Sequence, residues 1–219
     1  MSAPRRLVQT APVPAWALRA YDDLHERAVN FEPLGWEQAA ADPAWQVDRR
    51  QVDLPSEAPG PPQSRGPFEV ARRLLVSYEV ADPALVRAVY DEQAPLDGRD
   101  LLLVGRFFGL RFPLGVRIGG VVDGCDEVDG RSVHRFAWHY RTLDGHLERG
   151  QMDYEVVKFL DDGHVEFRIA AYSQRAANPN PIVRAGLALF GRPTQLRFYA
   201  RALQRMQTLT AAELTESTA

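Results

Sequence analysis

The chain has 219 residues, and its 26 lysines and arginines against 29 aspartates and glutamates leave a formal charge of −3. This slight acidic excess argues against a protein whose whole surface binds nucleic acid. The single cysteine, Cys125, excludes an intrachain disulfide and a multi-cysteine metal site. No apolar run is long enough to span a membrane, and no secretory apolar segment follows Arg5-Arg6, so a cytoplasmic protein is expected.

The first third of the chain is predicted to be a helical extension with a linker. Pro14 suits the first turn of a helix running to about Asn30, which has apolar residues at four-residue spacing: Trp16, Ala20, Leu24 and Ala28. A short helix is predicted over residues 36–41 and a strand over 47–54. The prolines of residues 55–67 cannot donate backbone hydrogen bonds, which predicts a linker or long surface loop. Residues 1–67 are therefore expected to form an N-terminal extension.

A compact domain is predicted over residues 68–208, followed by a C-terminal tail over 209–219. It begins with a β-rich run over residues 68–80, and Asp82-Pro83 then predicts the start of a helix. Two further strands are expected over residues 101–112 and 116–122. The pair Gly119-Gly120 allows a bulge in the second of them.

Residues 131–174 contain the strongest strand pattern. Phe136, Trp138 and Tyr140 alternate with more polar residues, and so do the apolar residues of 165–171. Asp161-Asp162-Gly163 predicts a hairpin turn, because glycine readily adopts a positive φ. These runs indicate a sheet with one strongly apolar face.

A long helix is predicted from Ile182 onward. Its apolar positions are Leu189, Leu196, Tyr199, Leu203 and Met206, and Pro193 should kink or break it. We expect the leucines to face the aromatic strand. The overall prediction is an α+β fold, in which a curved antiparallel sheet wraps around the C-terminal helix in a helix-grip layout.

The segment RFAWHYRTLDGHLERGQMDY, residues 135–154, resembles the hallmark FAYGTLPGHxExGEExF of an uncharacterised bacterial and plant family. The matching residues are Phe136, Ala137, Tyr140, Thr142, Leu143, Gly145, His146, Glu148 and Gly150. The likeness extends over residues 68–208, but Gln151 and Met152 replace the two glutamates. That family is similar to START-like, pollen-allergen-type helix-grip proteins. The resemblance implies this fold and no particular reaction.

His146 and Glu148 are the candidate catalytic pair, since a histidine near a carboxylate can serve general acid–base chemistry. The alternative is that His146 only caps backbone groups in the turn made by Asp144-Gly145. His134 and His139 point to opposite faces of one strand, so no histidine metal site is predicted, and no cofactor is expected.

A small apolar ligand is the expected partner, held between the sheet and the C-terminal helix. The predicted binding residues are Phe136, Trp138, Tyr140, Tyr154, Phe167, Ile169, Leu189 and Leu196. Two alternatives stay open: a cyclase- or hydrolase-type enzyme using His146, and an interaction module with a closed core. A homodimer is compatible with the sequence.

Overall fold

The computed structural model describes residues 6–107, 110–176 and 181–216. Its centre is an eight-stranded antiparallel sheet with the order β1-β3-β4-β5-β6-β7-β8-β2. The strands are Leu7–Gln9 (β1), Gln46–Leu54 (β2), Val86–Asp91 (β3), Asp100–Phe107 (β4), Leu110–Val128 (β5), Arg131–Thr142 (β6), Glu148–Phe159 (β7) and Val165–Arg175 (β8).

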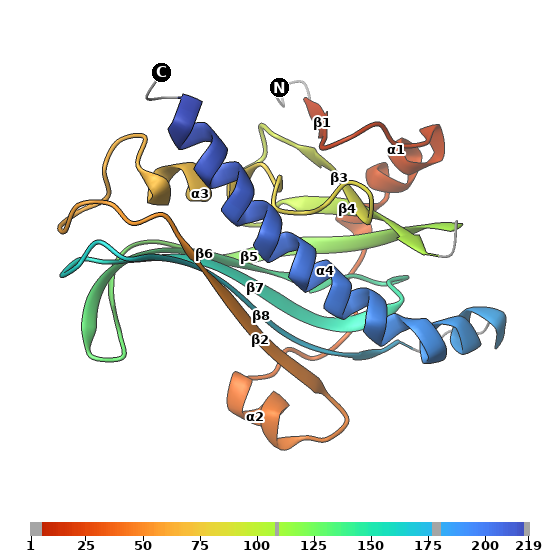
Figure 1. The fold of residues 1–219 in the computed structure, drawn as a ribbon. Coiled ribbons are helices and arrows are strands. Elements are labelled where there is room, and N and C mark those ends of the chain that lie inside the picture. Colours follow the sequence, from red (N-terminus) through yellow and green to blue (C-terminus); the bar gives the residue numbers. More distant parts are fainter. Residues whose placement is uncertain (1–5, 108–109, 177–180, 217–219) are drawn as a thin grey trace.

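The helices cover the sheet unequally. They are Ala15–Asp22 (α1), the 3-10 turn Leu24–Glu26 (η1), Trp36–Ala41 (α2), Pro67–Val76 (α3) and Pro181–Glu216 (α4). In Figure 1 the long blue helix α4 crosses one face of the curved sheet diagonally. This is the predicted α+β helix-grip layout. Among the described residues, no helix combines the length and apolar character needed to cross a membrane.

The main core lies between the sheet and α4. Trp138 of β6 is 2% exposed and belongs to the same apolar cluster as the α4 residues Phe198, Tyr199, Ala202 and Met206. The aromatic strand therefore faces α4, as predicted.

The helix face in that core differs from the predicted one. Leu196 is 37% exposed. The buried positions of α4 follow the 3.6-residue helical period, and Leu196 falls outside the buried face that they form. Leu203 is partly buried against the cluster. The side chain of Leu189 lies outside the described residues.

Two predictions between residues 68 and 91 are wrong. Residues 68–76 are helical, because Phe68, Ala71, Leu74 and Leu75 recur at helical spacing and all are fully buried. The helix expected after Asp82-Pro83 is a single turn, in which the Asp82 carboxylate accepts from the Ala84 N–H at 2.9 Å. The chain then enters β3 instead.

The chain before Phe68 contributes to the sheet. All nine residues of β2 pair with β8, from Gln46 opposite Ser173 to Leu54 opposite Val165. The helix α2 matches its prediction, whereas α1 ends at Asp22 rather than near Asn30. On the face of the sheet away from α4, the α1 residues Ala17 and Tyr21 pack in one cluster with residues of β3 and β4.

The proline-rich loop after β2 is anchored by a buried ion pair. Lys158 of β7 lies 2.6 Å from the Glu57 carboxylate, and the two side chains are 0% and 1% exposed. The ammonium also donates to the carbonyls of Ala58 at 3.0 Å and Pro61 at 2.9 Å. The loop predicted as a linker is therefore fastened to the sheet.

Three further predictions concern the β4–β5 segment, the bulge at Gly119-Gly120 and the proline in α4. The strand expected over residues 101–112 is divided, because β4 ends at Phe107 and β5 begins at Leu110. The predicted bulge is confirmed by a register shift between Gly119 and Val122. The helix α4 continues through Pro193 without a break. In Figure 1 its light-blue first turns run at an angle to the dark-blue remainder, so the axis bends.

Candidate functional site

A cavity of about 170 Å³ lies between α4 and the β3–β7 part of the sheet. Much of its wall is apolar, made by Leu85, Val86, Leu103, Leu114, Met152 and Phe198. Gly105 and Gly191 also line it and have no side chain to fill the space. Its polar residues are Tyr78, Arg106, Tyr140, His146, Glu148, Thr194 and Gln195. A mostly apolar cavity with few polar groups is the usual form of a small-molecule site.

The cavity lies beside the predicted binding residues rather than among them. Tyr140 lines it. The other predicted residues that face the core are at most 2% exposed and packed together, namely Phe136, Trp138, Tyr154, Phe167 and Ile169. The predicted binding residues include none from β3, β4 and β5, which form much of the cavity wall. The alternation of Leu101 and Leu103 in the sequence could have indicated an inward-facing strand there.

Tyrosine hydroxyls form a polar cluster where the cavity meets the core. The hydroxyls of Tyr78 and Tyr154 lie 3.4 Å apart, and that of Tyr140 donates to the Met152 sulfur at 3.3 Å. Burial raises the pKa of Tyr78 to about 12. The cavity therefore meets neutral phenols at this end.

The β6–β7 turn carries the motif residues, most of which hold the turn itself. Gly145 has a φ of 86°, which glycine adopts without strain. The Thr142 hydroxyl accepts from the Gly150 N–H at 2.9 Å. A Cβ at Gly150 would lie 2.2 Å from the Tyr172 carbonyl oxygen, so only glycine fits. These three residues have structural roles.

His146 is also used within the turn. Its Nδ1 lies 2.9 Å from both the backbone nitrogen and the carbonyl oxygen of Glu148, so it accepts from the first or donates to the second according to the tautomer. Burial lowers the pKa of His146 to about 4, so the ring is neutral at pH 7. The ring thus pairs with the backbone of Glu148 and not with its carboxylate, as in the capping alternative.

The Glu148 carboxylate is largely buried and interacts electrostatically with Arg192 and Arg175. Burial raises its pKa to about 6, although Arg192 and Arg175 act in the opposite direction. Arg192 is itself engaged by Asp48, to which its Nη2 donates at 2.7 Å. Glu148 also borders a second, polar pocket of about 330 Å³, so it stands at the junction of an apolar and a polar space.

Replacing Glu148 by glutamine should change how stability depends on pH. Because its pKa is raised in the folded protein, Glu148 favours folding below its unfolded pKa and loses that contribution as pH rises through about 6. We expect Glu148→Gln to be stabilising by up to about 2 kcal/mol at about pH 8 and near neutral at about pH 4. Urea denaturation of both proteins at the two pH values measures this. The prediction is contradicted if Glu148→Gln changes stability equally at the two pH values, or if Glu32→Gln at an exposed position has the same effect.

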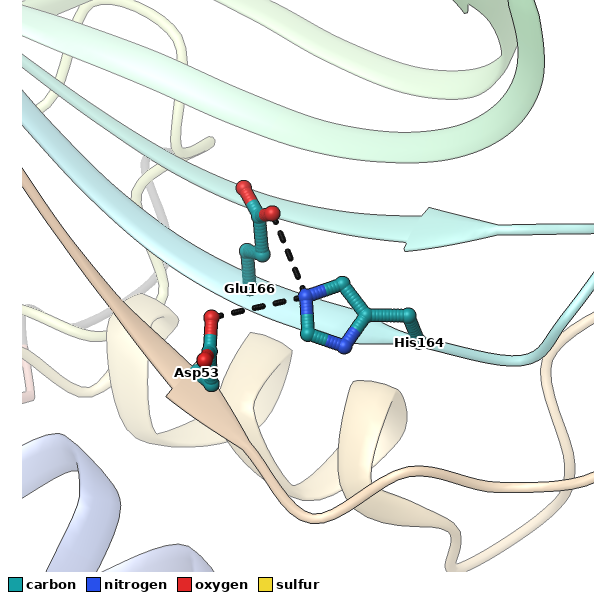
Figure 2. Close-up of side chains that lie close together, drawn as sticks. All are labelled: Asp53, His164 and Glu166. Atoms are coloured by element: carbon teal, nitrogen blue, oxygen red, sulfur yellow. Dashed lines mark hydrogen bonds and ion pairs between the residues drawn. The ribbon is translucent and has the colours of Figure 1, made fainter.

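His134 and His139 lie on opposite faces of the sheet. His134 packs against Phe68 on the core side, while His139 borders an outer-face pocket with Trp36. A different group, Asp53, His164 and Glu166, brings three ligand atoms within 4.8 Å of one another. Figure 2 shows the His164 ring between the two carboxylates. No local sequence pattern indicates this cluster, because Asp53 is distant from His164 and Glu166 along the chain.

Comparison with solved structures finds similar folds at low identity. Ara h 8.0201 is 8% identical with a TM-score of 0.44, over 78% of this chain and 99% of that one. Norcoclaurine synthase from Thalictrum flavum, in complex with dopamine and hydroxybenzaldehyde, is 7% identical with a TM-score of 0.43, over 84% and 96%. An uncharacterized protein from Rhizobium leguminosarum is 8% identical with a TM-score of 0.36, over 77% and 98%. The fold assignment rests on the observed sheet and α4, and not on these similarities.

A comparison with curated proteins finds no match. The family model described as a domain of unknown function (DUF1990) matches residues 30–205, including β2, the β6–β7 turn and much of α4. Because this match spans most of the chain, the protein belongs to the DUF1990 family.

Proposed function

We propose that the protein binds a small, mostly apolar molecule in the cavity between the sheet and α4, with a polar end of that molecule at Glu148. The main support is the difference between Glu148 and the other motif residues of the β6–β7 turn. Thr142, Gly145, His146 and Gly150 each serve the turn, whereas Glu148 borders both the apolar cavity and the polar pocket. Burial of an ionised carboxylate is costly, which supports a role toward a ligand.

The dimensions support a ligand of limited size. A dry cavity of about 150 Å³ admits a benzene-sized molecule, and this one measures about 170 Å³. Each apolar Å² that the ligand buries contributes roughly 25 cal/mol before the costs of association. A single ring or a short chain with one polar group therefore suits the site.

Filling the cavity should abolish binding. Leu114 is partly buried in the cavity wall, so Leu114→Trp would occupy the space, while Leu196→Trp on the exposed side of α4 is the matched control. We expect 2-phenylethanol, as a neutral probe, to bind the wild type and the control but to lose at least about tenfold in affinity with Leu114→Trp. Calorimetric titration measures this.

A small molecule recovered from the purified wild type by extraction and mass spectrometry, and missing from Leu114→Trp, would support the same conclusion. If the probe binds all three proteins equally, or none of them and nothing is extracted, the cavity is not a binding site. The interaction-module alternative would then stand, with the aromatic cluster of Phe31, Trp36 and Trp45 around Tyr172 as its candidate surface.

An enzyme on the same scaffold is the second candidate function. The observation that favours it is the pKa of Glu148 at about 6, close to the value a general acid or base needs near neutral pH. His146 is the weaker candidate, since its Nδ1 is already paired with the Glu148 backbone. With an extracted ligand, Glu148→Gln should lower turnover by about 10²–10⁴-fold if Glu148 transfers a proton. Unchanged turnover would exclude that role.

A further inference from the structure

The cluster of Asp53, His164 and Glu166 lies on the face of the sheet opposite α4, away from the cavity. Asp53 of β2 pairs directly with Glu166 of β8, so their side chains share one face. Their neighbours Leu54, Val165 and Phe167 point the other way into the core. His164 immediately precedes β8, and its ring reaches back between the two carboxylates (Figure 2).

Two of the three distances within the cluster match those around a tetrahedral metal ion. His164 Nε2 lies 3.2 Å from Glu166 Oε1 and 3.4 Å from Asp53 Oδ1. Ligand atoms about 2.0–2.1 Å from a tetrahedral ion are separated by roughly 3.3 Å. The two carboxylate oxygens lie within 4.8 Å of each other, so an ion that contacts all three atoms draws them closer together, and the exposed Asp53 side chain can make that movement.

Neighbouring groups orient two of the three ligands. Arg168 donates to Glu166 Oε2 at 2.8 Å, which leaves Oε1 directed at His164. The His164 ring stacks on Phe159, with centroids 5.8 Å apart and planes at 29°. The His164 backbone N–H donates to Asp162 at 2.9 Å. Such outer contacts hold ligands in place before an ion arrives.

The charge and exposure of the cluster suit a cation with an open position. Two carboxylates outweigh the single guanidinium of Arg168, and Asp53 is 74% exposed to solvent. We propose that Asp53, His164 and Glu166 bind one divalent transition-metal ion of the Zn²⁺ and Co²⁺ class, with water completing the shell. The imidazole nitrogen favours these ions over Mg²⁺ and Ca²⁺, which prefer oxygen ligands.

The test is titration of the untagged full chain with Zn²⁺ by calorimetry and with Co²⁺ by visible absorption. We expect one ion per chain, with the intense absorption of four-coordinate Co²⁺. His164→Ala and Asp53→Asn should each abolish the absorption. Arg168→Gln should weaken binding by about 10-fold or more, since it removes the group that orients Glu166.

The matched control is His134→Ala, which removes a histidine 3.3 Å from the single carboxylate of Asp123. It should leave binding unchanged, and circular dichroism verifies that every variant is folded. The proposal is overturned if the wild type shows no saturable binding, if binding survives both His164→Ala and Asp53→Asn, or if His134→Ala removes it. The first outcome would mean that His164 only forms ion pairs with the two carboxylates.

Discussion

Replacing Lys158 by methionine is expected to lower the free energy of unfolding by about 3–5 kcal/mol. The substitution keeps a similar volume but leaves the Glu57 carboxylate buried without its ion-pair partner. One oxygen of that carboxylate, Oε2, already has no hydrogen-bond partner among the described residues. The carbonyls of Ala58 and Pro61 also lose their donor. Urea denaturation measures the loss.

The double variant Glu57→Gln/Lys158→Met separates the lost charge pair from the lost packing. Removing both charges from a buried pair is often nearly neutral, so the double variant should recover much of the stability lost by Lys158→Met. Full recovery is not expected, because the two carbonyls stay without their donor. If Lys158→Met alone costs less than about 1 kcal/mol, the loop is not held by this ion pair.

Replacing Trp138 by alanine should cost about 3–5 kcal/mol of stability. Trp138 is 2% exposed and contacts the rings of Tyr78, Tyr140 and Tyr154, with a centroid distance of 4.8 Å to Tyr154. Its removal would leave a large hole in a core that cannot fully collapse. Thermal and urea denaturation measure the effect.

The control is Trp138→Phe, which keeps most of the apolar volume. The indole N–H of Trp138 has no hydrogen-bond partner in the part of the chain that the structure describes, so removing it relieves a buried polar group and offsets part of the lost packing. We expect Trp138→Phe to cost much less than Trp138→Ala. A loss of equal size in both variants would show that the indole itself makes a contact that phenylalanine cannot replace.

The strand pattern of residues 131–174 was predictable because it depends on local chemistry. Successive side chains of a strand point to opposite faces of the sheet, so the apolar residues of β6 and β8 lie on one face, whichever element covers it. Gly163 has a φ of 75°, and its turn follows from the steric freedom of glycine. The contact between the aromatic strand and α4 followed because these were the two most apolar faces of the chain.

The errors arose where packing overrides local preference. Residues 68–76 contain β-branched and aromatic residues typical of strands, yet their apolar side chains are buried together only in the helical period of α3. The turn after Asp82 starts like a helix, but β-branched Val86 and Val89 pair in the sheet instead. In α4, the side that faces the core depends on where the sheet lies. Leu196, which was predicted to face the sheet, lies on the exposed side.

The sequence by itself determined the helix-grip fold and its central strands, since alternation, turn glycines and an amphipathic final helix are properties of neighbouring residues. Only the tertiary structure decided the sites. The cavity is lined by residues far apart in the chain, such as Gly105 and Gly191, which only the fold brings to one space. The sequence motif had already made Glu148 a candidate, but the burial that raises its pKa depends on the fold. Asp53 meets His164 only through the pairing of β2 with β8. Distances between remote residues are set by the packing of the whole chain, which no local pattern records.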